Sequence, residues 1–377
     1  ICVVRTYLGL VCLIKNKGFR VLDFCRSSDF PDLIPDLFPN PEIRTLHLRI
    51  NHPVMIELTE NSTVSELQLL PFWEKGEIVH HSSPAGPSNM NLVLRIKTSH
   101  RSVILKQSKP FVRKFPQIPA PIQRIQVEYE FLKLLEHHPK AASFVPNILG
   151  YDAENHLLLT EDLGEGKDFS GIYSGEKNLE EKDISTLIEF LNLLHGIQAK
   201  YFPENMDMRI LNHEHIFNFP FQLENGFDLD SVQPGLQELA LGFKKDETLK
   251  AKIEVLGKRY LSSGNTLLHG DFYPGSWLEV SSGIKIIDPE FGFMGDGEFD
   301  LGVLLAHLDL GQQDDRLKKR VVSSYQHTLD QTLLDSYRGV EILRRLIGIA
   351  QLPVKMTLGQ KEDLLNFAKS LILRAHE

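Results

Sequence analysis

The sequence predicts an α+β protein of two lobes: a small N-terminal antiparallel sheet with one helix, and a larger, mainly helical C-terminal lobe. Two observations indicate this architecture. Short β-branched runs separated by turn residues fill residues 76–108, whereas apolar residues at helical spacing dominate the second half of the chain. Between the two patterns, Gly164 and Gly166 indicate a flexible connector. We therefore expect one lobe over residues 55–163 and the other over residues 164–377.

The first lobe is expected to contain four strands and one helix. Residues 76–81, 91–97 and 103–108 predict three antiparallel strands, because each run is rich in β-branched residues and bounded by turn residues. Residues 122–137 carry apolar side chains at mostly helical spacing and predict the helix. Residues 156–160 predict a further strand that leads into the connector.

The second lobe is expected to be mainly helical. An apolar stripe from Ile184 to Leu194 predicts one helix, and Gly196 is a plausible end for it. Two short strands, residues 266–269 and 284–287, interrupt the helical pattern, and each leads into an acidic residue.

The composition is that of an ordinary globular protein. Hydrophobic residues make up 42% of the 377 residues and charged residues 24%, which is near the average for such proteins. The formal net charge of −9 repels phosphate backbones and anionic lipid. No apolar stretch reaches the roughly 18 residues that a spanning helix needs. We therefore expect a cytoplasmic protein with no nucleic-acid partner and no membrane partner, and a homodimer is compatible with the sequence.

Residues 1–54 differ from the rest of the chain. All three cysteines, Cys2, Cys12 and Cys25, lie there, which argues against a disulfide framework in the main body. Prolines interrupt the segment, and neither a helical nor a strand period is sustained. We expect an N-terminal extension of uncertain status, with the functional protein beginning near Met55.

Two acidic residues that follow the C-lobe strands are the strongest functional signal. The first strand leads into His269-Gly270-Asp271 and the second into Asp288-Pro289-Glu290. Phosphoryl transfer from ATP needs one carboxylate that orients the attacking hydroxyl and further oxygens that hold Mg²⁺. Asp271 has the position of the catalytic-loop aspartate of kinases, and Asp288 has that of the metal-binding aspartate. Their separation of seventeen residues predicts a tight β-hairpin.

A second metal ligand has to be sought nearby. Five residues after Asp271, where many kinases have asparagine, this chain has Ser276. A neutral hydroxyl is a weaker ligand for a hard cation. Glu290, two residues after Asp288, is therefore expected to provide the missing carboxylate.

An upstream lysine completes the expected ATP site. Lys106 lies on the third predicted strand, where kinases have the lysine that contacts the α- and β-phosphates and pairs with a helix glutamate. Glu128 and Glu130 are the candidates for that glutamate; Glu128 is favoured, but helical periodicity separates them poorly. Residues 83–91 lie where a phosphate-covering loop is expected, although their one glycine and two prolines leave few free N–H donors.

Five motifs in a fixed order carry a family resemblance. They are VILKQSKPFVR at 103–113, RIQVEYEFL at 124–132, HGDFYPGS at 269–276, DPEFGFMGDGEFDLG at 288–302 and EILRRLIGIA at 341–350. From about Met55 to its end, the chain resembles the aminoglycoside phosphotransferase and choline kinase superfamily, and within it the methylthioribose kinase branch. The resemblance implies a two-lobed, protein-kinase-like fold that uses ATP and Mg²⁺.

The resemblance also implies roles for individual residues. Asp271 would be the catalytic base, and Asp288 and Glu290 would bind Mg²⁺. His269 and Asp300 would support the catalytic loop. Residues of the sheet, helix, phosphate loop, hinge and catalytic loop would contact ATP: Lys106, Glu128, Asn89, Asn91, Glu161, Leu163 and Ser276.

Arg344 and Arg345 match a paired arginine that helps to form the sugar site in this branch. They lie on a helix that is apolar nearly all round, so ion pairs with C-lobe carboxylates are the alternative role. Guanidinium donors suit sugar hydroxyls and the transferred phosphate, whereas a polycationic antibiotic needs an acidic cleft. The arginines therefore favour a hydroxyl-rich acceptor without positive charge.

The sequence thus predicts an ATP-dependent small-molecule kinase whose acceptor is a hydroxyl of a small sugar, first of all 5-methylthioribose of methionine salvage. An aminoglycoside phosphotransferase, a choline or amino-alcohol kinase and a catalytically silent nucleotide-binding scaffold are the alternatives. A protein kinase fits less well, because His269-Gly270-Asp271 lacks the arginine of H-R-D and only eleven residues separate Asp288 from Asp300.

Overall fold

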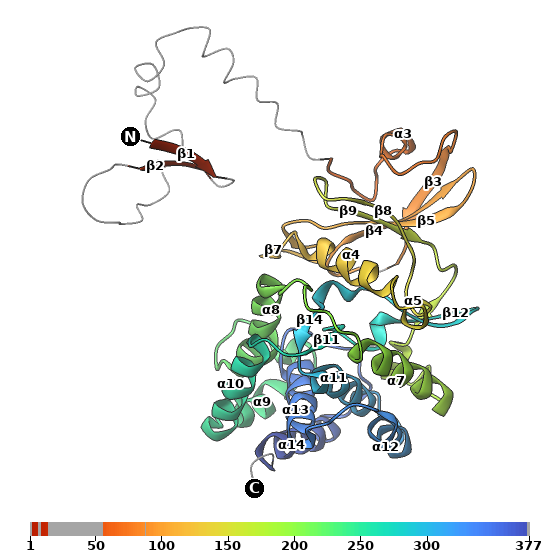
Figure 1. Ribbon diagram of the computed structural model, residues 1–377. Coiled ribbons are helices and arrows are strands. Elements are labelled where there is room, and N and C mark those ends of the chain that lie inside the picture. The colour runs from red at the N-terminus through yellow and green to blue at the C-terminus, as the bar shows by residue number, and fades with distance from the viewer. Residues whose placement is uncertain (1, 7–8, 14–55, 87, 375–377) are drawn as a thin grey trace. The chain divides into compact units, whose positions relative to one another are not determined.

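The chain forms two compact units, Ile1–Ile56 and Glu57–Glu377. The computed structural model describes residues 2–6, 9–13, 56–86 and 88–374 (Figure 1). Among the described residues, no helix combines the length and the apolar character needed to cross a membrane.

The first unit contains one antiparallel ladder, in which β1 (Cys2–Thr6) pairs with β2 (Gly9–Leu13). The remainder of the expected extension, residues 1, 7–8 and 14–54, lies outside the described residues. The role of that extension, and the division of the rest into lobes at residue 163, therefore stay predictions.

A five-stranded antiparallel sheet with the order β3-β4-β5-β9-β8 dominates the N-lobe, the part of the second unit up to residue 163 (Figure 1). Its strands are β3 (Val79–Pro84), β4 (Leu92–Thr98), β5 (Ser102–Gln107), β8 (Ile148–Asp152) and β9 (Leu157–Glu161). The four predicted strands are present, and β8 adds a fifth that the sequence pattern does not predict. β3 begins three residues later than expected, because a turn closes at Gly76 (φ +85°) and the Glu77 N–H donates to the Glu74 carbonyl oxygen (3.0 Å).

The predicted N-lobe helix is α4 (Arg124–Leu135), which packs against β8 and β9. Its apolar residues Ile125, Phe131 and Leu135 are completely buried, as the helical spacing requires. Four shorter elements complete this lobe: α3 (Val64–Gln68), β6 (Phe111–Val112), β7 (Phe115–Pro119) and α5 (Pro139–Ala142).

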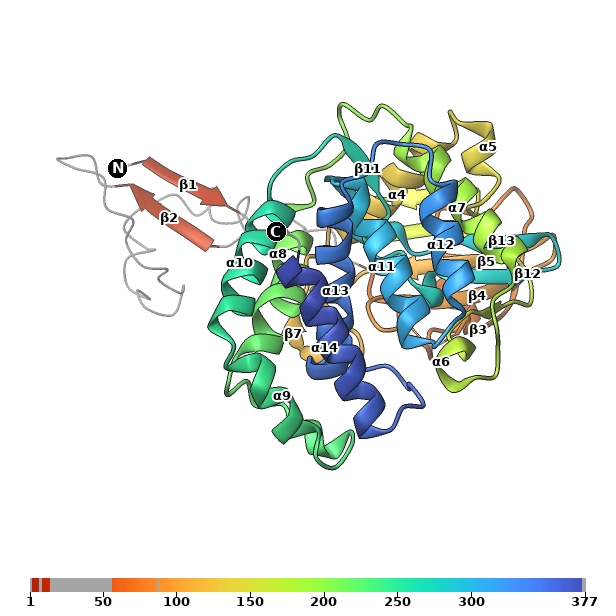
Figure 2. The same cartoon turned by 90° about the horizontal axis from the view of Figure 1, so that it is seen from below.

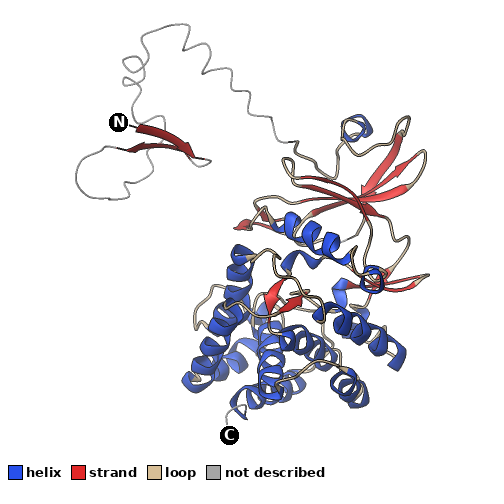
Figure 3. Ribbon diagram, in the orientation of Figure 1, coloured by secondary structure: helices blue, strands red, loops and turns tan. Residues whose placement is uncertain are grey.

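Helices make up most of the C-lobe, the part that follows residue 163 (Figure 3). The α-helices are α6 (Gly171–Ser174), α7 (Glu181–His195), α8 (Met206–His213), α9 (Leu236–Lys244), α10 (Glu247–Leu261), α11 (Gly297–Leu310), α12 (Asp315–Ser324), α13 (Gln331–Ile347) and α14 (Leu358–Arg374). Shorter helical turns are η1 (Glu214–Asn218), η2 (Phe219–Phe221), η3 (Leu229–Ser231), η4 (Pro274–Ser276) and η5 (Pro289–Phe291). The predicted stripe lies on α7, which ends at Gly196 as expected.

The core of the C-lobe is built around α11, in which every residue except Glu298 is buried. α11 packs against α13, and α13 packs in turn against α14 (Figure 2). A helix surrounded by other helices carries apolar residues on all sides, which explains why α11 lacks a polar face.

A tight β-hairpin lies within the seventeen residues that separate Asp271 from Asp288, as the sequence predicts. β11 (Thr266–Leu268) pairs with β14 (Phe293–Gly295), and β13 (Gly283–Ile286) pairs with β12 (Trp277–Val280), which also contacts β10 (Lys167–Asp168). The intervening segment folds into a strand of its own, because the turn before Gly283 (φ +115°) closes a tight β12–β13 hairpin.

The two acidic loops nevertheless lie side by side. The Ile287 N–H donates to the Ser276 carbonyl oxygen (3.0 Å), and His269 Nε2 donates to the Ile287 carbonyl oxygen (3.0 Å). These contacts hold the segments that contain Asp271 and Asp288 together, although β11 and β13 pair with other strands.

Candidate active site

The loop that follows β11 is held in place by Asp300 of α11. The two oxygens of its buried carboxylate accept the backbone N–H groups of His269 (2.8 Å) and Gly270 (3.0 Å). Gly270 has φ +82°, and a Cβ at this position would lie 2.1 Å from the Phe291 carbonyl oxygen. Only glycine fits this turn, so the course of the chain into Asp271 is fixed.

Asp271 lies beside the paired arginines. Its Oδ1 is 3.9 Å from Arg344 Nη2 and 3.7 Å from Arg345 Nη2. Burial raises the pKa of Asp271 by more than the two guanidinium groups lower it. Ser276 Oγ donates to the Asp271 carbonyl oxygen (2.9 Å), so this hydroxyl braces the loop backbone in the structure.

The second cluster surrounds Lys106 of β5. Lys106 Nζ lies 2.5 Å from Glu128 Oε1 of α4 and also contacts Asp288 Oδ1. The structure thus selects Glu128 over Glu130 as the partner. Burial would lower the pKa of Lys106, but the two carboxylates outweigh burial and raise it. Asp288 has φ +62°, an uncommon conformation for a residue other than glycine that often marks functional sites.

The third cluster joins the two lobes through Glu290. Its Oε2 accepts from Asn91 Nδ2 (2.8 Å) and lies 3.2 Å from Arg124 Nε. Arg124 also donates to Asn91 Oδ1 (2.9 Å) and to the Met90 carbonyl oxygen (2.8 Å). Burial raises the pKa of Glu290 to about 7. Asn89, by contrast, is exposed, so the structure separates the two predicted asparagines.

Sequence reasoning missed Arg124 and Asn205. Arg124 lies one helical turn before Glu128, on the buried face of α4. Because a buried cation needs a partner, its position on that face was a signal in the sequence that could have identified it. Asn205 Nδ2 donates to the carbonyl oxygens of Glu290 and Gly292 (3.0 Å each). No local sequence signal identifies Asn205, because its contacts depend on how distant segments pack.

The donor chemistry near Asp288 fits Mg²⁺. In the described part of the chain, no group of three or more His, Cys, Asp or Glu side chains could hold a metal. Mg²⁺ is usually held by one or two carboxylates together with substrate phosphates and water, so Asp288 and Glu290 would be sufficient protein ligands. A bound ion would neutralise the charge of the phosphates.

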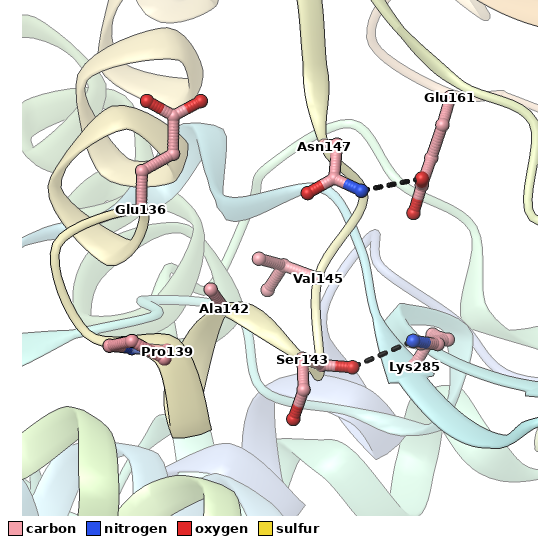
Figure 4. A pocket seen from close by; sticks show the side chains of 8 residues that line it. All are labelled: Glu136, Pro139, Ala142, Ser143, Val145, Asn147, Glu161 and Lys285. Atoms are coloured by element: carbon pink, nitrogen blue, oxygen red, sulfur yellow. Dashed lines mark hydrogen bonds between the residues drawn. The ribbon is translucent and has the colours of Figure 1, made fainter.

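The predicted hinge follows β9. Glu161 Oε2 accepts from Asn147 Nδ2 (2.7 Å), and Glu161 pairs with Val103, so its side chain lies on the opposite face of the sheet from Lys106. It lines a pocket of about 390 Å³ that includes none of the clustered residues above (Figure 4). Only the backbone of Glu161 is therefore available to a nucleotide beside Lys106. Leu163 is partly buried and follows the end of the strand.

Arg344 and Arg345 share one carboxylate that the sequence prediction did not name. Glu341 of α13 accepts from the Nε atoms of both arginines. Spacings of three and four residues place these side chains on one helix face, so this signal was available in the sequence. Both arginines therefore form the ion pair that the sequence left as the alternative role, and both also lie close to Asp271.

Comparison with known proteins agrees with this geometry. Residues 87–339 match the phosphotransferase enzyme family (APH). The methylthioribose kinase of Bacillus cereus (strain B4264) is 26% identical over 268 residues, which cover 67% of this chain and 65% of the relative. That of Exiguobacterium sibiricum is 28% identical over 312 residues, 77% of each chain. The chain thus spans slightly less than two thirds of the length of the Bacillus cereus relative.

The fold also resembles that of a solved structure. The crystal structure of LicA in complex with AMP matches with a TM-score of 0.50 at 15% identity, over 83% of this chain and 96% of that chain. The structure of choline kinase LicA from Streptococcus pneumoniae matches with a TM-score of 0.47 at 14% identity, over 78% and 94%. The predicted two-lobed, kinase-like fold is confirmed. Because the family match extends over more than half of the chain, the protein belongs to the phosphotransferase enzyme family.

Proposed function

We propose that the protein is an ATP-dependent kinase that transfers the γ-phosphoryl group to a hydroxyl of a small, uncharged sugar, with 5-methylthioribose as the first candidate. The observation that carries the proposal is the arrangement of Asp271. It lies on a loop held by Asp300, with two guanidinium groups within 4 Å and no hydrogen bond from either. The similar methylthioribose kinases support the choice of acceptor.

Each cluster has a place in this reaction. Asp271 orients the acceptor hydroxyl and takes its proton as the new O–P bond forms, while the bond between the γ-phosphorus and the β–γ bridging oxygen breaks and ADP leaves. Lys106 holds the nucleotide phosphates, and Glu128 keeps the lysine in position. Asp288 and Glu290 would hold Mg²⁺. The guanidinium groups stabilise negative charge on the transferred group, in a buried site where such interactions are strong.

The charges around Asp271 favour an uncharged acceptor. Asp271 and Glu341 provide two negative charges, and Arg344 and Arg345 provide two positive ones. The two carboxylates are balanced by the two guanidinium groups, so neither negative charge is left over for a polycationic acceptor. Such an acceptor would place positive charges beside the guanidinium groups, and like charges in a buried site repel one another. An aminoglycoside or amino alcohol is therefore less suitable than a sugar.

The test is a substrate panel with the purified full chain. Methylthioribose, ribose, choline and kanamycin are each incubated with ATP and Mg²⁺, and ADP release and phosphorylated product are measured. We expect the largest kcat/KM with methylthioribose. A larger value with kanamycin or choline would overturn the acceptor. ATP binding without phosphorylation of any acceptor would favour the silent scaffold instead.

A further inference from the structure

Glu341 lies behind the paired arginines and is almost completely buried. Its Oε2 accepts from Arg344 Nε, and its Oε1 accepts from Arg345 Nε (2.8 Å). Burial would raise the pKa of Glu341, but the two guanidinium groups and His307 outweigh burial and hold the pKa well below its usual range. Glu341 is therefore an ionised carboxylate that binds the same atom of each arginine.

This contact leaves the outer ends of both guanidinium groups near Asp271. Nη2 is in each case the atom closest to Asp271 Oδ1, at 3.9 Å for Arg344 and 3.7 Å for Arg345. Both distances are too long for hydrogen bonds, so these donors are not saturated by Asp271. The ring of Tyr273 lies 5.2 Å from the Arg345 guanidinium and limits its movement on another side.

We propose that Glu341 is a positioning residue for phosphoryl transfer, which sets the orientation of both arginines toward the acceptor and the transferred phosphoryl group; this inference rests on the proposed function. Glu341 holds each guanidinium by Nε, so the Nη2 group of each arginine, which faces Asp271, remains available for the reactants. Without it, two adjacent cations would be free to turn and pair directly with Asp271, which would occupy the carboxylate that the acceptor hydroxyl needs.

His307 and Tyr173 support Glu341 from α11 and α6. His307 Nε2 lies 3.0 Å from Glu341 Oε1, and its Nδ1 lies 2.6 Å from the Tyr173 hydroxyl. An ionised carboxylate only accepts, so Nε2 carries the hydrogen, and Nδ1 accepts from Tyr173. Burial lowers the pKa of His307 to about 4, which keeps the ring in this neutral form near pH 7. The chain of bonds thus gives Glu341 one orientation.

A purely structural role for Glu341 makes a different prediction. If Glu341 only neutralised buried cations, its loss would lower stability and leave the response to the two substrates unchanged. Asp309 provides the matched control, because it is also buried and pairs with Arg338 of the same helix α13 (2.6 Å). Among the residues that the structure describes, Asp309 bonds to Arg338 and Lys318, and no hydrogen bond or ion pair joins it to Asp271.

The test compares Glu341→Gln, Glu341→Asp and Asp309→Asn in the full chain. Steady-state kinetics are measured with ATP and acceptor both varied, together with melting temperatures. For Glu341→Gln we expect kcat/KM for the acceptor to fall about tenfold or more, while KM for ATP changes by less than about twofold. Glu341→Asp should recover part of the loss, because the charge remains. Asp309→Asn should change the melting temperature alone.

The outcomes distinguish the positioning role of Glu341 from the proposed function. Acceptor kinetics of Glu341→Gln that match Asp309→Asn would overturn the positioning role while leaving the proposed function intact. A wild-type chain inactive on every acceptor would overturn both. If Glu341→Gln does not fold, His307→Phe keeps the carboxylate but removes its donor. It should lower kcat/KM for the acceptor with little change for ATP, and unchanged acceptor kinetics would overturn the inference.

Discussion

The carboxylates on the N-lobe side of the candidate site are paired differently from Asp271 on the C-lobe side. On the N-lobe side, Glu128 and Asp288 contact Lys106, and Glu290 contacts Arg124, all within hydrogen-bonding or ion-pair distance. Each of these carboxylates is thus paired with a cation of the protein. A nucleotide and its metal ion would therefore have to exchange partners with them, which costs desolvation but gives a defined geometry.

On the C-lobe side, Asp271 faces Arg344 and Arg345 without a hydrogen bond to either. Glu341 already binds the Nε atoms of both arginines. Under the proposed function, pairing on one side would prepare ion binding, while incomplete pairing on the other would leave Asp271 and the guanidinium donors available to an acceptor. Four predictions test this comparison.

The largest effect is expected for Asp271→Asn. Loss of a general base should lower kcat by roughly 10²–10⁴ and leave ATP affinity nearly unchanged, because the N-lobe clusters remain intact. Steady-state kinetics and calorimetric ATP binding measure the two quantities, with Asp309→Asn as the control. Near-normal turnover by a folded Asp271→Asn protein would remove Asp271 from the mechanism.

The next largest effect concerns the two proposed metal ligands. Asp288→Ala should raise the Mg²⁺ concentration needed for half-maximal activity at least about tenfold, and more than Glu290→Ala does. The reason is exposure: the Asp288 side chain is 48% exposed, whereas Glu290 is 5% exposed and shared with Arg124. Titration of activity with Mg²⁺ measures the requirement. An unchanged requirement in both variants would rule out the metal assignment.

A smaller effect on stability should come from His307. Its pKa is about 4 in the folded protein and about 6.5 in an unfolded chain, so below pH 6.5 only the unfolded state binds the proton. The free energy of unfolding should therefore fall by up to ~3 kcal/mol as the pH decreases from 6.5 to 4.

Urea unfolding at a series of pH values measures this dependence. His307→Gln should flatten it, because glutamine can bond to Glu341 but does not titrate. His137→Gln changes an exposed histidine and should leave it unchanged. Identical slopes for wild type and His307→Gln would contradict a buried, neutral His307.

The smallest effect is expected for deletion of residues 1–54. Every proposed catalytic and binding residue lies after Met55. We therefore expect kcat and both KM values of the truncated protein to stay within about twofold of the full chain, and its melting temperature to stay within a few degrees. Kinetics and thermal unfolding of the truncated protein measure this. Insoluble or inactive protein would show that the segment contributes to the second unit.

The sequence by itself determined the type and order of most elements and named the residues that are proposed to carry the chemistry. Asp271, Asp288 and Lys106 follow or lie on short strands, and local periodicity identified those strands and α4. Such signals are local, because helical and strand spacing and turn residues depend on neighbours in the chain. The family motifs have the same local character.

Only the tertiary structure decided which groups pair. It selected Glu128 over Glu130, paired β11 with β14, and joined Arg124 to Glu290 across the lobes. These outcomes depend on contacts between segments far apart in the chain, where packing sets distances that periodicity does not contain. Burial then decides the charge states, because desolvation and nearby charges act only after the chain has folded.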